Sequence, residues 1–179
     1  MNVIERILRD AEELPVGSEG LLVAPYLCGE RTPYMDPHAK GCFIGLSLRH
    51  THGHLVRAKM EGVAYSLCKA LDIFKELQVP VKTVLCSGGG ARSPLWRQIL
   101  ADAFDNPVKW QRGEEHSAIG AAIVGALATG RSVTSAATKD ESSSDTALPR
   151  SERVAIYRKQ RAIYKRIHPQ LAGIFADLS

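Results

Sequence analysis

The sequence predicts an α/β domain with a mainly parallel core sheet flanked by helices. Three observations carry this prediction. Short apolar segments alternate with longer segments of helical periodicity over much of the 179-residue chain. A run of three glycines, Gly88–Gly90, joins one apolar segment to a helical one. The hydrophobic fraction of 45% is normal for a globular protein, so a core can form.

Apolar periodicity places the individual elements. Helices are expected at residues 4–14, 55–77, 94–104, 117–128 and 152–175, and strands at residues 20–26, 42–46 and 107–110. A buried strand is expected through Val81, Val84 and Leu85. Ser151 is expected to cap the last helix, and the His168–Pro169 pair to kink or divide it.

The predicted helix at residues 55–77 is the longest. It carries one apolar stripe that is expected to face the core: Val56, Met60, Val63, Leu67, Leu71, Phe74 and Leu77. Gly62 lies in the middle of this helix. A glycine there costs about 1 kcal/mol relative to alanine, so Gly62 predicts close backbone packing.

The glycine turn is the segment around which the other elements are arranged. Gly88, Gly89 and Gly90 permit backbone angles and close approaches that a Cβ would forbid. Ser93 suits an N-cap and Pro94 the first helical position. Bare backbone that faces the positive end of a helix is a place for a nucleotide or another anion. The alternative is a tight turn without a ligand, since the run matches neither the P-loop pattern nor G-x-G-x-x-G.

Two further groups of residues have a structural and a functional interpretation. Trp96 could wall an adenine pocket or simply pack, and packing is slightly favoured. His50, His52 and His54 alternate as metal ligands can, but no cysteine or carboxylate stands beside them. Zinc sites show a fuller ligand set, so a structural role is favoured for these histidines.

Two polar segments also leave alternatives open. Glu115 and His116 could serve acid/base chemistry, but they directly precede a helix that Ser117 can cap, and helix initiation is favoured. The loop at residues 29–41 holds three charged side chains that could form an ion-pair cluster or lie at the mouth of a substrate cleft: Glu30, Arg31 and Asp36.

Composition narrows the class of protein. The net charge of +4 is not concentrated enough to predict a nucleic-acid partner, and no apolar run reaches the length of a membrane span. The four cysteines show no C-x-x-C spacing, and no signal peptide precedes them. We therefore expect free, mostly buried thiols in a reducing cytoplasm.

Four segments closely resemble the FGGY carbohydrate kinases, the xylulokinase branch in particular. They are residues 88–98 with 101–102 and 106–108, residues 25–33 with 36–37 and 41, residues 58–64, and residues 115–122. They occur in the family's order between about residues 20 and 130. The resemblance implies an incomplete ribonuclease H-like/actin-like ATPase domain, the C-terminal FGGY kinase domain.

The resemblance also implies a nucleotide site, with ATP or ADP and Mg²⁺ as cofactors bound together with a missing domain. Gly89 and Gly90 would contact the adenosine and the α-phosphate, while Gly88, Ala91 and Ser93 would shape the pocket. The resemblance assigns no catalytic residue and no metal ligand to this chain.

The expected organisation has three parts. Residues 1–131 resemble the C-terminal nucleotide-binding domain without its opening hairpin, residues 132–150 form a polar loop, and residues 151–179 form a helical tail. Without the hairpin one sheet edge is expected to be exposed, and exposed edges invite pairing with another chain.

The resemblance implies ATP-dependent phosphorylation of a ketopentose or a related sugar or polyol. The family's general-base aspartate and phosphate loops lie outside the matched segments, so no turnover is expected from this chain alone. The expected partners are a sugar-binding N-terminal kinase domain, a small-molecule sugar and a second copy, with no nucleic acid and no membrane. The alternatives are a non-catalytic nucleotide-binding or oligomerisation module; a dehydrogenase is disfavoured by the glycine spacing.

Overall fold

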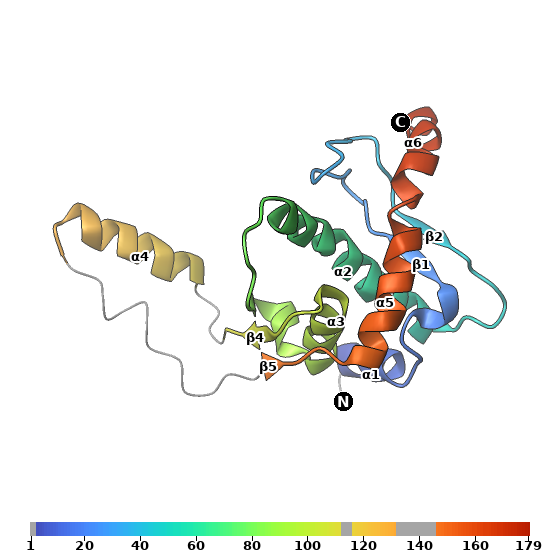
Figure 1. Cartoon of the computed structure of the whole chain (residues 1–179), viewed down its shortest axis with the longest axis horizontal. Coiled ribbons are helices and arrows are strands. Elements are labelled where there is room, and N and C mark those ends of the chain that lie inside the picture. The colour runs from blue at the N-terminus through green and yellow to red at the C-terminus, as the bar shows by residue number, and fades with distance from the viewer. Residues whose placement is uncertain (1–2, 112–115, 132–145) are drawn as a thin grey trace.

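The structure is a computed structural model that describes residues 3–111, 116–131 and 146–179. The described residues form helices and short strands in alternation, which confirms the α/β class (Figure 1). In chain order the elements are α1 (Val3–Glu12), β1 (Leu22–Ala24), β2 (Cys42–Ile44), α2 (His52–Glu76), β3 (Val84–Cys86), α3 (Pro94–Phe104), β4 (Val108–Trp110), α4 (His116–Ala128), β5 (Thr146–Ala147), α5 (Ser151–Tyr164) and α6 (Ile167–Asp177).

The strands form two small sheets. β1 and β2 pair antiparallel, and β3, β4 and β5 form a mixed sheet in which β3 and β4 are parallel. The parallel pair and its connecting helix α3 follow the prediction. The strand predicted through Val84 and Leu85 is confirmed, but its predicted burial is wrong, because β3 lies at the edge of its sheet and Leu85 is 61% exposed. β4 pairs with one side of β3, and no described strand pairs with the other side.

The buried face of α2 differs from the predicted one. Leu67, Phe74 and Leu77 of the apolar stripe are exposed. Val56, Met60 and Leu71 of the stripe are partly buried against the main core. The fully buried face carries mostly small and polar residues: Gly53, His54, Arg57, Ala58, Glu61, Gly62, Ala64, Tyr65, Cys68 and Lys69. α2 rests on β1, α1 and α3, and hydrogen bonding and close backbone approach decide which side faces them.

Gly62 confirms the close packing that the sequence predicts. A Cβ placed on Gly62 would lie 2.1 Å from the carbonyl oxygen of Val23 in β1. No side chain can be accommodated at that distance. The absence of a Cβ therefore sets the spacing between α2 and the β1–β2 sheet.

One buried carboxylate joins three parts of the fold beside this contact. Glu61 is 1% exposed, and its Oε1 accepts hydrogen bonds from the Gly17 N–H, Arg57 Nε and the Tyr157 hydroxyl, each at 2.9 Å. Its Oε2 accepts one from Ser18 Oγ at 2.8 Å. The network links the segment after α1 to α2 and α5. A buried charge satisfied in this way is well placed to define how these elements meet.

The C-terminal segment is helical, as expected, and packs into the main core through Tyr157, Tyr164 and Phe175. The predicted division of the last helix is confirmed, although the break falls at residues 165–166, just before His168. Ser151 is the first residue of α5 and not its cap. Most of the predicted polar loop, residues 132–145, lies outside the described residues.

Helix α4 lies apart from the other helices (Figure 1). It begins at His116, so Ser117 falls inside the helix and is not its cap. Glu115, the other residue of the predicted acid/base pair, lies outside the described residues. None of the α4 side chains from 117 to 128 is buried, although this stretch contains no charged residue. A helix that is apolar on all sides is usually buried in a complete protein.

Candidate functional site

The glycine turn connects β3 to α3 through one short 3₁₀ turn. Gly88 has φ +81° and ψ −176°, a conformation that only glycine adopts without strain. Ser93 Oγ accepts a hydrogen bond from the Trp96 N–H at 3.3 Å, and Pro94 is the first residue of α3. The predicted N-cap and N-terminal proline are therefore confirmed.

The backbone of the turn is bare. Among the described residues, no atom lies within 4 Å of a Cβ built on Gly88 or Gly89. The nearest atoms to a Cβ on Gly90 belong to the Trp96 indole, at 3.7 Å. The turn is therefore open to a ligand, and only Gly88 is required by its backbone angles.

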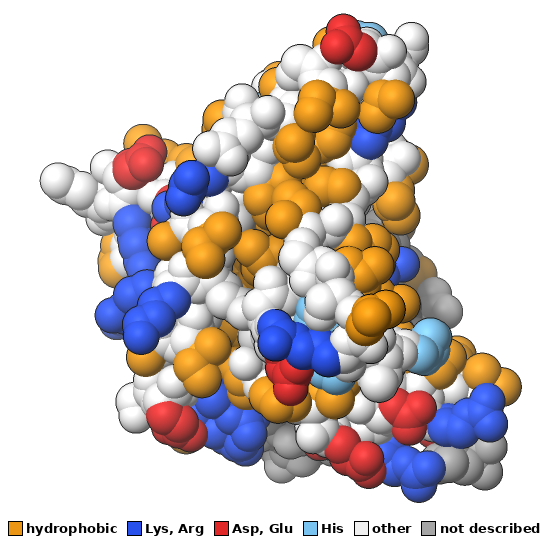
Figure 2. Space-filling model, turned by 90° about the vertical axis from the view of Figure 1, so that its right-hand side faces the viewer, with side chains coloured by type: hydrophobic (Ala, Val, Ile, Leu, Met, Phe, Trp, Pro, Cys, Tyr) orange, Lys and Arg blue, Asp and Glu red, His pale blue; other side chains and the backbone are white. Residues whose placement is uncertain are grey.

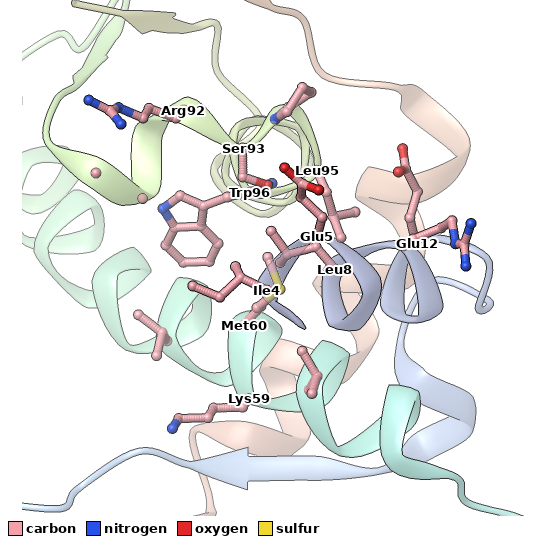
Figure 3. A pocket seen from close by; sticks show the side chains of 16 residues that line it. Ile4, Glu5, Leu8, Glu12, Lys59, Met60, Arg92, Ser93, Leu95 and Trp96 are labelled. Carbon is pink, nitrogen blue, oxygen red and sulfur yellow. The ribbon is translucent and has the colours of Figure 1, made fainter. Parts of the chain in front are cut away.

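Beside the turn lies a pocket of about 1040 Å³ between α1, α2 and the start of α3. Side chains of Ile4, Leu8, Met60 and Trp96 converge on it, whereas Arg92 extends away from its apolar centre (Figure 3). Charged residues from three elements complete the lining: Glu5, Arg9, Glu12, Lys59 and Arg92. The pocket thus combines apolar walls with exposed backbone and a charged rim.

The structure brings together most of the sequence-predicted nucleotide residues. Gly89, Gly90 and Ser93 line the pocket. Gly88 precedes them at the entrance of the turn, and Ala91 is buried with its side chain in the core. Ala91 therefore supports the turn from behind and does not contact the pocket.

Trp96 both packs and lines the pocket. Its indole lines the pocket and also packs against the main core. The first turn of α3 therefore supplies a rigid aromatic wall directly beside the bare glycines.

Sequence reasoning missed one residue that holds the turn in place. Arg97 is buried, and its guanidinium donates hydrogen bonds to the carbonyl oxygens of Ala91 and Arg92, the latter at 3.1 Å. It also lies over the Trp110 ring, 4.9 Å from the centroid. A charged residue on the inward side of the predicted helix was the signal that could have revealed it.

The sequence did not predict that residues of α1 and α2 line the pocket. Val56, Met60 and Val63 belong to the α2 stripe that the sequence assigns to the core. Val56 and Met60 do pack against the core, and all three also line the pocket. Ile4 and Leu8 of α1 complete it. These residues lie far from the glycines in sequence, so only the tertiary arrangement identifies them.

Two of the three histidines near the start of α2 are held by backbone groups. His50 Nδ1 accepts the Ser47 N–H at 2.9 Å, and His54 Nδ1 accepts the Thr51 N–H at 3.1 Å. In the neutral ring Nε2 then carries the proton and offers no lone pair to a metal. Within the described ranges, no group of three or more His, Cys, Asp or Glu residues could hold a metal ion.

The loop at residues 29–41 is pinned to two helices. Glu30 Oε2 accepts a hydrogen bond from Ser66 Oγ of α2 at 3.1 Å, and Asp36 Oδ2 lies 2.8 Å from His168 Nε2 of α6. The hydrogen bond with His168 lowers the pKa of Asp36. Arg31 is exposed, so the loop is fixed through Glu30 and Asp36.

A buried lysine lies beneath this loop. The Lys69 ammonium donates a hydrogen bond to the Tyr26 hydroxyl at 3.2 Å and lies 3.8 Å from the Tyr34 ring centroid. Burial lowers the pKa of Lys69 to about 8. The facing rings offer a cation–π contact that offsets part of the cost of burying the charge.

The four cysteines are free, as expected. Only Cys68 is buried, so the expectation of mostly buried thiols is wrong. The described helices include none that is long and apolar enough to cross a membrane.

Comparison with solved structures places the whole described arrangement in one fold. The structure of a ligand-bound xylulose kinase from Lactobacillus acidophilus matches with a TM-score of 0.84 and 28% sequence identity, covering 98% of this chain and 36% of that one. A gluconate kinase from the same organism matches with a TM-score of 0.83 and 28% identity, covering 98% of this chain and 36% of that one. The actin-like kinase fold expected from the resemblance is confirmed.

Sequence comparison gives the same assignment. A xylulose kinase from Bacillus subtilis (strain 168) is 36% identical over 166 residues, which cover 92% of this chain and 33% of that protein. This chain thus spans about a third of the length of that relative. The profile of the FGGY family of carbohydrate kinases, C-terminal domain, matches residues 5–129. The chain therefore belongs to the FGGY family of carbohydrate kinases, and residues 5–129 match the C-terminal domain of that family.

Proposed function

We propose that the pocket at the glycine turn binds an adenine nucleotide, and that this chain is the ATP-binding part of a xylulokinase-like kinase. The reaction would be ATP-dependent phosphorylation of a ketopentose or a related sugar or polyol. The observation that carries the proposal is the juxtaposition of bare backbone at Gly89 and Gly90 with a pocket of about 1040 Å³.

The pocket suits the two halves of a nucleotide. Ile4, Leu8, Met60 and Trp96 offer an apolar surface to a base. The open glycines and the N-terminal end of α3 offer N–H groups and a positive dipole to a phosphate. With its base against the apolar walls, a bound nucleotide would have its phosphates beside the glycine turn.

Magnesium has no visible ligand set here. Mg²⁺ neutralises charge on the phosphates during phosphoryl transfer. Within the described part of the chain, no cluster of three or more metal-ligating side chains is found. We therefore assign no metal ligand to this chain and propose that the ion is held by the phosphates and by residues of a sugar-binding domain.

We further propose that a sugar-binding N-terminal domain supplies the proton acceptor and the sugar contacts. The chain spans about a third of the length of its relatives, which include a xylulose kinase and a gluconokinase. Two surfaces support an additional domain: the exposed end of the α2 stripe at Phe74 and Leu77, and the open edge of β3 at Leu85. The free cysteines fit a reducing compartment such as the cytoplasm.

Calorimetric titration of the chain with MgADP tests the nucleotide site. We expect binding by the intact chain and its loss in Gly89→Trp, because a side chain at Gly89 enters the pocket without meeting protein atoms. Gly173→Trp is the matched control, since Gly173 is exposed on α6 and equally open. Equal binding by both variants would refute the assignment of the site.

Kinase assays test whether the proton acceptor and the sugar contacts lie in another domain. The chain alone should give no turnover with xylulose and MgATP, since the described residues supply no assigned catalytic base. Addition of a sugar-binding domain from a relative should restore measurable phosphorylation, and Gly89→Trp should abolish that gain. Turnover by the chain alone would contradict the proposal that the base lies in another domain.

A further inference from the structure

Arg97 lies in the first turn of α3, behind the glycine turn. It is 3% exposed, and its guanidinium donates hydrogen bonds to the carbonyl oxygens of Ala91 and Arg92. We propose that Arg97 is a positioning residue for the nucleotide. It holds the turn in its binding conformation before the ligand arrives, so the affinity for MgADP depends on it. This inference rests on the nucleotide site proposed above.

The first contact of Arg97 anchors Gly88. The Ala91 carbonyl oxygen accepts a hydrogen bond from the guanidinium, and the Ala91 N–H donates to the Gly88 carbonyl oxygen at 3.1 Å. Ala91 is itself buried, with 1% of its surface exposed. One residue thus connects Arg97 to the glycine whose φ of +81° is strained for any other residue.

The second contact anchors Gly90. The Arg92 carbonyl group, whose oxygen accepts from Arg97 at 3.1 Å, belongs to the same planar peptide unit as the Ser93 N–H. That N–H donates to the Gly90 carbonyl oxygen at 3.1 Å. The guanidinium therefore fixes a peptide unit that in turn holds Gly90, a residue of the pocket lining.

Side-chain packing does not hold the glycines. Among the described residues, no atom lies within 4 Å of a Cβ built on Gly88 or Gly89. Glycine loses more conformational freedom on ordering than any other residue. A turn that became ordered only on binding would lose affinity by that amount, because ordering costs reduce the free energy of binding. The hydrogen bonds from Arg97 order the turn during folding instead.

The guanidinium is held from its other side by β4. Its central carbon lies 4.9 Å from the centroid of the Trp110 ring. Trp110 pairs with Cys86, the last residue of β3, in the parallel pair of strands. The strand that enters the turn and the ring that contacts Arg97 are therefore neighbours in one sheet. A planar guanidinium suits this site because it can bind two carbonyl groups and also stack on a ring.

Arg97 differs from the basic residues on the protein surface. Figure 2 shows Lys and Arg side chains spread over one face, several of them beside Asp or Glu. The Arg49 side chain, for example, is 64% exposed in its ion pair with Glu19. Burying a charge is unfavourable unless the charged group is hydrogen-bonded. Arg97 meets this condition partly through the turn, so the turn and the guanidinium stabilise each other.

Calorimetric titration of the full 179-residue chain with MgADP tests the proposal. We expect the affinity to fall about tenfold or more in Arg97→Lys, because lysine keeps the charge but lacks the planar fork that reaches two carbonyl groups. Tyr157→Phe is the control. It removes a buried hydrogen bond to Glu61, and Tyr157 is no part of the pocket lining. This control should lower stability and leave the affinity unchanged.

Hydrogen exchange of the nucleotide-free proteins gives a second readout. The N–H groups of Ala91 and Ser93 should exchange about tenfold faster in Arg97→Lys than in the unmodified chain. The N–H groups in the middle of α2 should exchange at the same rate in both proteins. A change confined to the turn separates lost positioning from a general loss of stability.

Arg97→Met carries the test if Arg97→Lys does not fold, because methionine leaves no buried charge, and the same fall in affinity is expected. Unchanged affinity in these variants, with binding lost in Gly89→Trp, would overturn the positioning role and leave the nucleotide site in place. An equal loss of affinity in Tyr157→Phe would also overturn it, because lower stability would then account for the loss. Absence of MgADP binding by the unmodified chain would overturn the nucleotide site and this inference together.

Discussion

Gly62 and Gly89 show two opposite uses of glycine in one domain. A Cβ on Gly62 would lie 2.1 Å from the Val23 carbonyl oxygen, whereas the described protein offers no atom within 4 Å of a Cβ on Gly89. The first glycine lets two parts of the same chain touch. The second leaves space that the chain itself does not fill.

This difference separates the region that holds the domain together from the region that can accept a ligand. At the α2–β1 contact a Cβ on Gly62 would overlap Val23, and the adjacent Glu61 is a buried carboxylate with four hydrogen-bond donors. The glycine turn borders a pocket of about 1040 Å³. Substitutions in the first region should therefore act on stability, and those in the second on binding.

Breaking the Glu61 network should give the largest loss of stability. Glu61→Gln leaves the Arg57 guanidinium, 2% exposed, without its carboxylate, and it adds an N–H₂ group among donors. Removal of one partner of a buried pair costs about 3–5 kcal/mol of unfolding free energy. Urea denaturation measures the effect. Glu19→Gln at the exposed Arg49 pair is the control and should cost less than about 1 kcal/mol.

Gly62→Ala should be the next largest effect. The added methyl group overlaps the Val23 carbonyl oxygen, so α2 must move away from β1, at a cost of about 3 kcal/mol. Gly173→Ala in α6 is the matched control, since its Cβ meets no described atom. That change should stabilise by about 0.5 kcal/mol through helix propensity. Thermal unfolding that is equal for the two variants would contradict the packing role of Gly62.

The sequence predicted the helix after the glycines well and the buried face of α2 poorly. Ser93 and Pro94 mark the start of α3 by local chemistry alone, and the predicted span of 94–104 matches the structure. The buried face of α2 depends on partners distant in sequence, such as Tyr157 on α5. Apolar periodicity shows where apolar residues lie along the sequence. It does not show which side of the helix packs against another element.

The candidate site was predicted in part for the same reason. The turn from Gly88 to Ser93 is local and readable from the sequence. The pocket wall that Ile4 and Leu8 of α1 form could not be predicted from the sequence, because nothing near those residues indicates that they lie beside the glycines. The apolar stripe of α2 was assigned to the core, yet part of it lines a pocket and part of it is exposed.

The packed region should also show a pH dependence, smaller than either substitution effect. Burial lowers the pKa of Lys69 to about 8, below its ordinary value of 10.5. Between these values the unfolded chain binds more protons, so stability attributable to Lys69 rises with pH from about 8 to 10.5. Lys69→Met should abolish this rise.

Urea denaturation of the unmodified chain and of Lys69→Met is measured at pH 7.5, 8.5 and 9.5. The difference between their free energies of unfolding isolates the contribution of Lys69. Other groups also contribute in this range: burial raises the pKa of Cys68 from its ordinary value of 9.0 to about 11, so its thiol loses a proton in the unfolded chain first. These contributions are common to both proteins and cancel in the difference. A difference in unfolding free energy that stays constant across the three pH values would show that Lys69 is not held in this environment.

Gly89→Ala should have the smallest effect on stability and a clear effect on binding. A methyl group at Gly89 meets no described atom, and the residue has no positive φ, so the unfolding free energy should change by less than about 0.5 kcal/mol. Gly88→Ala should cost about 1–3 kcal/mol, because its φ of +81° is strained for any other residue. If the turn contacts the nucleotide, MgADP affinity should fall at least tenfold in Gly89→Ala. Unchanged affinity with unchanged stability would mean that the space beside Gly89 is not where the nucleotide lies.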